Sequence, residues 1–186
     1  NKTKNMFPKK YLNILFLFFI SISCTNELDF SQIDDYSAKP EYIGAVTYFT
    51  VLPLQFFNQS GVQETERTDI TDFRFFENDY LKKNLVKIDF NVEIKNEFNT
   101  AFIAQVILLD VNGNDTYVFK ELTVAANNLD YKFIETIEVS ANPNIKNTAK
   151  VKVVVKFADS SVVVDPNAKT EFQFKSSAKI YIDTTK

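Results

Sequence analysis

Apolar and polar residues alternate along much of the chain after residue 85, and this pattern is the clearest structural signal in the sequence. In 87–95, every second position is apolar, while charged residues and asparagine fill the positions between them. A period of two places the apolar side chains on one face of a strand and the polar ones on the other. The same alternation returns in 149–157 and 171–182. No segment after residue 24 has the period and length of a helix, so the pattern predicts an all-β protein.

Further strands are predicted where β-branched and aromatic residues gather between turn signals. Residues 102–109 are apolar on both faces, as in a central strand, and Asn112-Gly113 then marks a hairpin. The predicted strands are 42–51, 73–76, 85–95, 102–109, 116–124, 131–139, 149–157 and 171–182.

Roughly seven to nine short strands with frequent turns are typical of an antiparallel β-sandwich. The predicted fold is therefore an all-β antiparallel sandwich of the immunoglobulin or fibronectin type. A small closed β-barrel is the alternative. A membrane barrel is disfavoured, because the polar faces of the strands carry lysine and glutamate where a lipid-facing band would be apolar.

The longest loop predicted from the sequence covers 58–72, and two phenylalanines precede it. Because side chains of a strand point alternately to its two faces, Phe56 and Phe57 cannot both face the same core. One of them is expected either to be covered by the 58–72 loop or to contact a partner. The other aromatic residues nearby are expected to pack mainly between two sheets, and they are Tyr48, Phe49, Phe73, Phe75 and Phe76.

The first 24 residues have the layout of a secretory signal. Lys9 and Lys10 precede an apolar run over 11–20, and small residues in 21–24 supply an expected cleavage site. The apolar run is shorter than the roughly 20 residues that a membrane span needs. The single cysteine of the chain, Cys24, stands at the end of this segment.

This segment resembles the signal peptides of bacterial lipoproteins. Ile22, Ser23 and Cys24 match the lipobox, while Ser21 stands where the usual residue is leucine. The resemblance implies that Cys24 is lipidated and becomes the first residue of the mature protein, which two or more acyl chains would anchor stably in a membrane. It also implies a location in the cell envelope, on the periplasmic face or the surface of the outer membrane.

The sequence thus predicts three parts. Residues 1–23 are the signal peptide, with Met6 as the expected start of translation; 24–41 form a lipidated acidic tether; and 42–186 form a single β-sandwich domain. As a flexible coil the tether would span about 23 Å. Removing the signal takes away four lysines and no acid, which leaves 17 basic against 24 acidic residues and a net charge of −7. Nucleic acid, which requires a basic patch, is therefore not an expected partner.

Residue types that the chain lacks exclude several kinds of chemistry. It has no histidine and one cysteine, so neither a Ser-His-Asp triad nor a histidine-ligated metal site can form. Its three glycines are too far apart for a phosphate-binding loop. Carboxylate chemistry and oxygen-only metal binding remain. The acidic residues of 58–72 are interpreted as a solvated loop, and we expect no cofactor and no catalytic residue.

One stretch has part of the spacing of a calcium-binding loop. Asp110, Asn112, Asn114 and Glu121 occupy the positions of oxygen ligands, and the glutamate falls at position twelve. However, Asp115 stands where such a loop needs glycine, and the flanking segments are predicted strands rather than helices. The alternative is an ordinary Asn-Gly hairpin without a metal.

Taken together, the missing catalytic residue types predict a non-enzymatic protein, and the resemblance of the leader implies an envelope-anchored lipoprotein. Its sandwich is expected to bind another envelope protein or to serve as a structural or adhesive module. The contact would form by pairing at a sheet edge or through an aromatic patch around Phe56 and Phe57. The alternative is a carbohydrate-binding accessory lipoprotein, in which tyrosine, asparagine and carboxylate side chains on loops hold a glycan.

Overall fold

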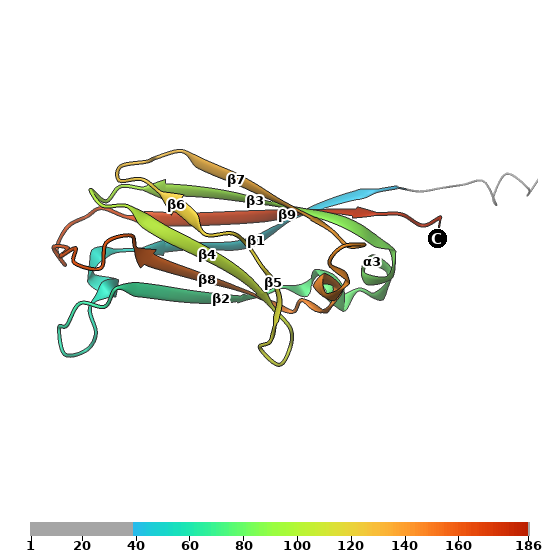
Figure 1. Cartoon of the computed structure of the whole chain (residues 1–186), viewed down its shortest axis with the longest axis horizontal. Coiled ribbons are helices and arrows are strands. Elements are labelled where there is room, and N and C mark those ends of the chain that lie inside the picture. Colours follow the sequence, from blue (N-terminus) through green and yellow to red (C-terminus); the bar gives the residue numbers. More distant parts are fainter. Residues whose placement is uncertain (1–38, 186) are drawn as a thin grey trace, which may run out of the picture. The chain divides into compact units, whose positions relative to one another are not determined.

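The computed structural model describes residues 39–185, which form two antiparallel β-sheets and four short helical segments (Figure 1). The strands are β1 (Glu41–Val51), β2 (Glu66–Asp72), β3 (Leu85–Asn96), β4 (Phe102–Leu109), β5 (Asp115–Val118), β6 (Leu122–Val124), β7 (Tyr131–Glu138), β8 (Lys150–Phe157) and β9 (Phe172–Ile182). The helical segments are the 3₁₀ turns η1 (Pro53–Phe56), η2 (Arg74–Glu77) and η3 (Pro143–Asn147) and the α-helix α3 (Asp79–Asn84). None of these helices is long and apolar enough to cross a membrane.

The two sheets have the strand order of a jelly roll. The first sheet runs β1-β9-β3-β7, and the second runs β2-β8-β4-β5 with β6 also paired to β4. Because β5 and β6 pair with opposite ends of β4, they act as two parts of one strand. Successive strands from β1 to β4 then lie in alternate sheets, as in the double-sheet jelly roll.

This order confirms the predicted all-β antiparallel sandwich and corrects its expected topology. The sheets are not closed into a barrel, since each keeps two edge strands. In an immunoglobulin domain the first two strands belong to the same sheet. Here β1 and β2 belong to different sheets, because residues 52–65 cross from one sheet to the other through η1 and do not form a tight hairpin.

The strand directions divide the connections between two ends of the sandwich (Figure 1). At one end, which we call the loop end, lie the connections β1–β2, β3–β4, β6–β7 and β8–β9. At the other, the hairpin end, lie η2 and α3, the β4–β5 hairpin and η3. The chain enters β1 at the hairpin end, where Glu41 pairs with Tyr181 near the end of β9.

Two local predictions around residue 72 are wrong. The second half of the predicted 58–72 loop is strand β2, and the predicted strand 73–76 is mostly the 3₁₀ turn η2. β2 gives no apolar alternation because Arg67, Asp69 and Thr71 lie opposite inward-facing valines of β8. In the η2 region, buried Phe73 and Phe76 pack on each other, and this contact favours a turn over an extended strand.

Candidate partner-binding surface

Exposed apolar side chains gather at the loop end. Leu54, Val62 and Val163 are 64%, 60% and 87% exposed, and Leu52 is exposed as well. Pro53 and Val163 line one cleft, so the β1–β2 and β8–β9 connections lie side by side. We call Leu52, Leu54, Val62 and Val163 the apolar tip. Single exposed apolar residues are common on proteins, but a group of them marks a contact site.

A closed turn in the β1–β2 connection presents Val62. The Oδ1 atom of Asn58 accepts the backbone N–H groups of Ser60 and Val62 over 2.9 and 3.0 Å. The Asn58 N–H in turn donates to the Val62 carbonyl oxygen over 2.9 Å. Gly61 has a φ of 74° and supplies the left-handed conformation that the turn needs. Val62 is therefore held outward by backbone whose polar groups are satisfied.

A single glutamine fixes the β8–β9 connection against this turn. The Nε2 atom of Gln63 donates to the Val162 carbonyl over 2.7 Å, and its Oε1 atom accepts the Val164 N–H over 3.0 Å. Val164 is buried, whereas Val163 between the two clamped residues projects into solvent. The exposure of Val163 thus follows from hydrogen bonds to a residue far away in the sequence.

The apolar tip rests on an aromatic base. Phe56 is fully buried and packs against Phe98, Phe102 and Phe157, with ring centroids 6.3, 5.9 and 4.5 Å away. Phe57, next to it, is half-buried against the core. The expectation that Phe56 lies on a contact surface is therefore corrected. It belongs to the core, because η1 turns its ring inward, while the neighbouring Leu54 is exposed.

A cleft of about 480 Å³ opens beside the apolar tip. Its lining includes Pro53 from β1–β2, Asn99 from β3–β4, Asn127 from β6–β7, and Val163 and Thr170 from β8–β9. Every connection of the loop end therefore contributes to one depression. Clefts with an apolar lining and a few polar groups are the usual form of a binding site.

Buried Asn96 holds two of these connections in place. Its Nδ2 atom donates to the carbonyl oxygens of Thr100 and Ala125 over 2.9 and 2.8 Å. Its Oδ1 atom accepts the Phe98 N–H over 3.0 Å, and its own N–H donates to the Asn128 carbonyl over 2.7 Å. No pattern in the sequence predicts this role, since it depends on the β3–β4 and β6–β7 connections meeting in space.

Carboxylates give the cleft an acidic character. Glu97 and Asp165 line it, and no lysine or arginine does. Lys95 pairs with both Glu97 and Glu171, over 2.6 and 3.4 Å, and its hydrogen bond lowers the pKa of the Glu97 carboxyl. Asp165 is exposed, and one of its oxygens accepts the N–H of Asn167 over 2.9 Å. Its carboxylate has no cationic partner among the described residues, so it faces solvent as a free negative charge.

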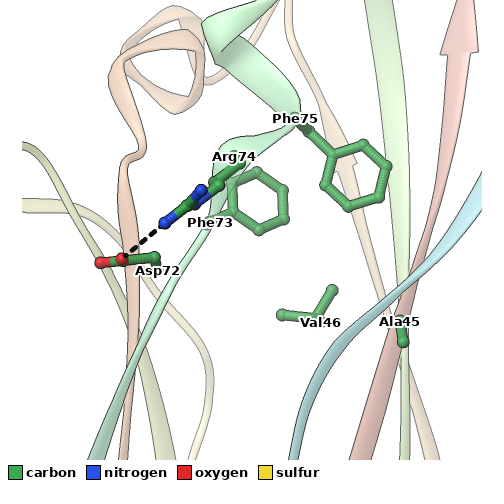
Figure 2. Close-up of a pocket in the computed structure, with 6 residues that line it drawn as sticks. All are labelled: Ala45, Val46, Asp72, Phe73, Arg74 and Phe75. Carbon is green, nitrogen blue, oxygen red and sulfur yellow. Dashed lines mark ion pairs between the residues drawn. The ribbon is translucent and has the colours of Figure 1, made fainter.

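A second hollow, of about 380 Å³, lies between the edge strands β1 and β2. Figure 2 shows the Phe73 and Phe75 rings beside it, with the ion pair of Asp72 and Arg74 on the other side of Phe73. Phe75 lies over Gly44, where an added Cβ would come within 2.3 Å of its ring. Because the rings pack on each other and the charges are paired, we assign this hollow to packing between the diverging sheets.

The sheet edges are poorly suited to accept a partner's strand. β1 carries a bulge between Ala45 and Thr47, and β2 points Arg67 and Asp69 inward, opposite buried valines of β8. β7 points Glu135 inward, where it accepts a hydrogen bond from a tyrosine of β5, and β5 and β6 have only four and three residues. Bulges, inward charges and short strands are the devices by which natural edges avoid pairing.

The residues of the calcium-like stretch do not form one site. Asp110 closes the β4–β5 hairpin, where its Oδ1 atom accepts the N–H groups of Asn112 and Asn114, both over 2.8 Å. Glu121 instead forms an ion pair with Lys156 over 2.8 Å. Within residues 39–185, no cluster of three acidic, cysteine or histidine residues is arranged to hold a metal.

Several predicted features lie outside the described residues. They include Cys24 with the signal segment 1–23, and residues 24–38 of the tether. The lipid anchor therefore stays a prediction.

Comparison with known proteins indicates a fold and no family. No protein family model matches the sequence, and no curated protein matches it. Among solved structures, a Parabacteroides distasonis protein described as secreted is 14% identical, with a TM-score of 0.50 over 62% of this chain and 37% of its own. The VP2 subviral particle of infectious bursal disease virus is 13% identical, with a TM-score of 0.39 over 77% of this chain and 32% of its own. The chain thus spans about a third of the length of these solved chains. The likeness to the Parabacteroides distasonis protein supports the β-sandwich fold alone.

Proposed function

We propose that this protein is an envelope-anchored lipoprotein whose β-sandwich binds another envelope protein through the loop end, without catalysing a reaction. The observation that carries the proposal is the apolar tip, in which Leu54, Val62 and Val163 are exposed together on an ordered base. Exposed apolar groups held in fixed positions lose little conformational freedom on binding, which favours affinity. The predicted lipid on Cys24 would supply the anchor.

The chain enters the sandwich at the end opposite the apolar tip, and this supports binding through the loop end. β1 begins at Glu41 at the hairpin end, whereas the apolar tip lies at the opposite end of the same strands (Figure 1). A tether that joins the sandwich at Glu41 would leave the loop end free to meet a partner away from the membrane. The protected edges favour contact through the loop end over strand addition, which was the other mode open from the sequence.

Photocrosslinking in intact cells tests the proposal. A photoreactive amino acid is placed at Leu54 or at Val163, and the matched control carries it at Val111. Val111 is 71% exposed, close to the exposure of Leu54, but it lies in the β4–β5 hairpin at the other end. We expect one discrete crosslinked species of defined mass from Leu54 and Val163 and none from Val111.

The anchor is tested in the same cells with Cys24→Ala. We expect this variant to lose membrane association and, with it, most of the crosslinked species. Equal crosslinking from Val111 and Val163, or none from either tip position, would contradict binding through the loop end.

A carbohydrate ligand is the second candidate function. It is favoured by one observation, the presence of Asn99 and Asn127 in the lining of the cleft, since amide side chains donate and accept hydrogen bonds as sugar hydroxyls require. A glycan array probed with the full chain tests it. Binding that is lost in Asn127→Gly would support this function, and no binding at high protein concentration would remove it.

A further inference from the structure

The loop-end cleft has a floor and a lip that would accept an apolar side chain. Phe98 and Val164 line it and are nearly fully buried, while Pro53 forms part of its wall. Val163 belongs both to this lining and to the apolar tip, so the cleft continues the exposed apolar surface. At interfaces, the side chains that contribute most to affinity are those that fill such pockets at the centre of the contact.

Two amide side chains in the same lining are free to bind a ligand. Asn99 and Asn127 are exposed, and neither side chain has a hydrogen-bond partner among the described residues. Asn127 has a φ of 54°, in the left-handed region, and its backbone N–H donates to the Phe98 carbonyl over 2.9 Å. The side-chain amide of asparagine has both a donor and an acceptor, so it can pair at the same time with an N–H and a carbonyl of a peptide backbone.

The charges of the cleft determine what should flank the apolar side chain. Glu97 and Asp165 are the charged residues of the lining, so the cleft is negative. Of the two, Asp165 lacks a cationic partner among the described residues. Complementary charges across an interface raise the association rate and exclude wrong partners, and this favours a segment with lysine or arginine beside its apolar residue.

A sugar fits these features less well. The aromatic ring in the lining belongs to Phe98, which is 3% exposed, and this is too little surface for a sugar ring to stack on. Val163, which belongs both to the lining and to the apolar tip, also extends the surface in an apolar direction, which suits a protein partner more than a polysaccharide.

We propose that the loop-end cleft anchors an apolar side chain of a basic segment of the partner protein, whose backbone is bound by Asn99 and Asn127. This inference rests on the proposed function and names the chemistry of the partner segment. The apolar tip would surround the anchor and exclude water from it, while Asp165 would meet the flanking cation.

Two short peptides test this assignment by nuclear magnetic resonance on the isotope-labelled full chain. The probes are acetyl-Lys-Leu-Lys-amide and acetyl-Glu-Leu-Glu-amide, which share the leucine and differ in charge. We expect the basic peptide to shift the side-chain amide signals of Asn99 and Asn127 and to bind about tenfold more tightly than the acidic one. Raising sodium chloride from about 50 to about 500 mM should weaken the binding of the basic peptide severalfold.

A pair of variants separates the cleft from the surface around it. Ala168→Trp places a large ring in the cleft lining, and the matched control Ala126→Trp adds the same ring to an exposed position of the β6–β7 connection. We expect Ala168→Trp to abolish the shifts at Asn127, and Ala126→Trp to preserve them. Asn127→Gly keeps the left-handed backbone without the side-chain amide, and it should weaken the binding of the basic peptide severalfold.

The outcomes distinguish this inference from the proposed function. Equal binding of both peptides, shifts that avoid Asn99 and Asn127, or a sugar that shifts the same amides in place of the basic peptide would overturn the inference. If Ala168→Trp retains the cellular crosslink from Val163, partner binding stands while the anchoring role of the cleft fails. If the protein that keeps Ala168 also forms no crosslink from Val163, the proposed function itself fails.

Discussion

The two ends of the sandwich differ in where their connecting segments place apolar side chains. At the hairpin end, the connections satisfy their own backbone: Asn78 caps α3 by accepting two N–H groups, Asp110 closes the β4–β5 turn, and Ile145 of η3 is fully buried. At the loop end, the backbone is also satisfied, yet Leu54 and Val163 are left in solvent. Stability accounts for the hydrogen bonds and the buried Ile145 of the hairpin end. It does not account for a group of apolar side chains that two connections hold outward at the loop end.

Val111 shows what an incidental exposed apolar residue looks like. It is 71% exposed in the β4–β5 hairpin and, unlike Val163, it does not line the loop-end cleft. The tip residues differ because they come from two connections that are remote in sequence and joined through Gln63. The arrangement of exposed residues, rather than exposure itself, therefore distinguishes the two ends.

The largest expected effect comes from removing the Phe56 ring, which is at the centre of the aromatic base under the apolar tip. Phe56→Ala should lower the free energy of unfolding by about 3 to 5 kcal/mol, because it deletes a fully buried ring that packs on three others. Phe57→Ala, at the half-buried neighbour, should lose much less. Urea unfolding followed by circular dichroism measures both. Equal losses for the two variants would mean that Phe56 is not the core residue of the pair.

A buried amide provides the next largest effect. Asn96→Ala removes three side-chain hydrogen bonds and leaves buried backbone groups without partners, which should cost about 2 to 3 kcal/mol. Amide hydrogen exchange should quicken in 97–101 and 125–130 and stay unchanged in the β4–β5 hairpin. Asn91→Ala, on the polar face of the same strand, is the control and should stay within about 0.5 kcal/mol. Faster exchange at both ends would show that the loop end is not stabilised separately.

The sequence was sufficient for the sandwich and insufficient for its topology. Alternation in β3, β8 and β9 reports burial on one face of a strand, and this is a local property. The sheet to which each strand belongs depends on where connections such as 52–65 lead, and alternation carries no information on that. β2 was missed for a related reason, since an edge strand with Arg67 and Asp69 pointing inward shows no apolar period.

The candidate surface was only partly predictable. The sequence indicated Phe56 and Phe57, beside the 58–72 loop, as contact residues, whereas Phe56 is buried and the neighbouring Leu54 is exposed. A 3₁₀ turn does not follow the strand rule that places neighbouring side chains on opposite faces. The exposure of Val163 could not be predicted from a run of three valines, since hydrogen bonds from Gln63 to Val162 and Val164 leave Val163 pointing outward.

The contact between Tyr117 of β5 and Glu135 of β7 depends on pH and should have a smaller effect on the free energy of unfolding. Burial, together with a 2.7 Å hydrogen bond to Glu135, raises the pKa of Tyr117 from 10.0 to about 12. A pKa that is higher in the folded state means that this contribution to stability is complete below pH 10 and is lost as the pH rises toward 12. Urea unfolding at a series of alkaline pH values should show this loss. Tyr117→Phe should flatten the profile in that range, and an unchanged profile would show that the contact contributes nothing.

The smallest expected change in stability is the one that isolates function. Val163→Asp and Leu54→Asp replace side chains that contact solvent, so each should change the free energy of unfolding by no more than about 0.5 kcal/mol. The same substitutions should abolish the crosslinks described above, because a charge in the centre of an apolar contact must be desolvated without a partner. Val111→Asp is the matched control and should affect neither property. A tip variant that loses stability would mean that the loop end needs these residues for folding, and the contrast between the two ends would then have a structural cause.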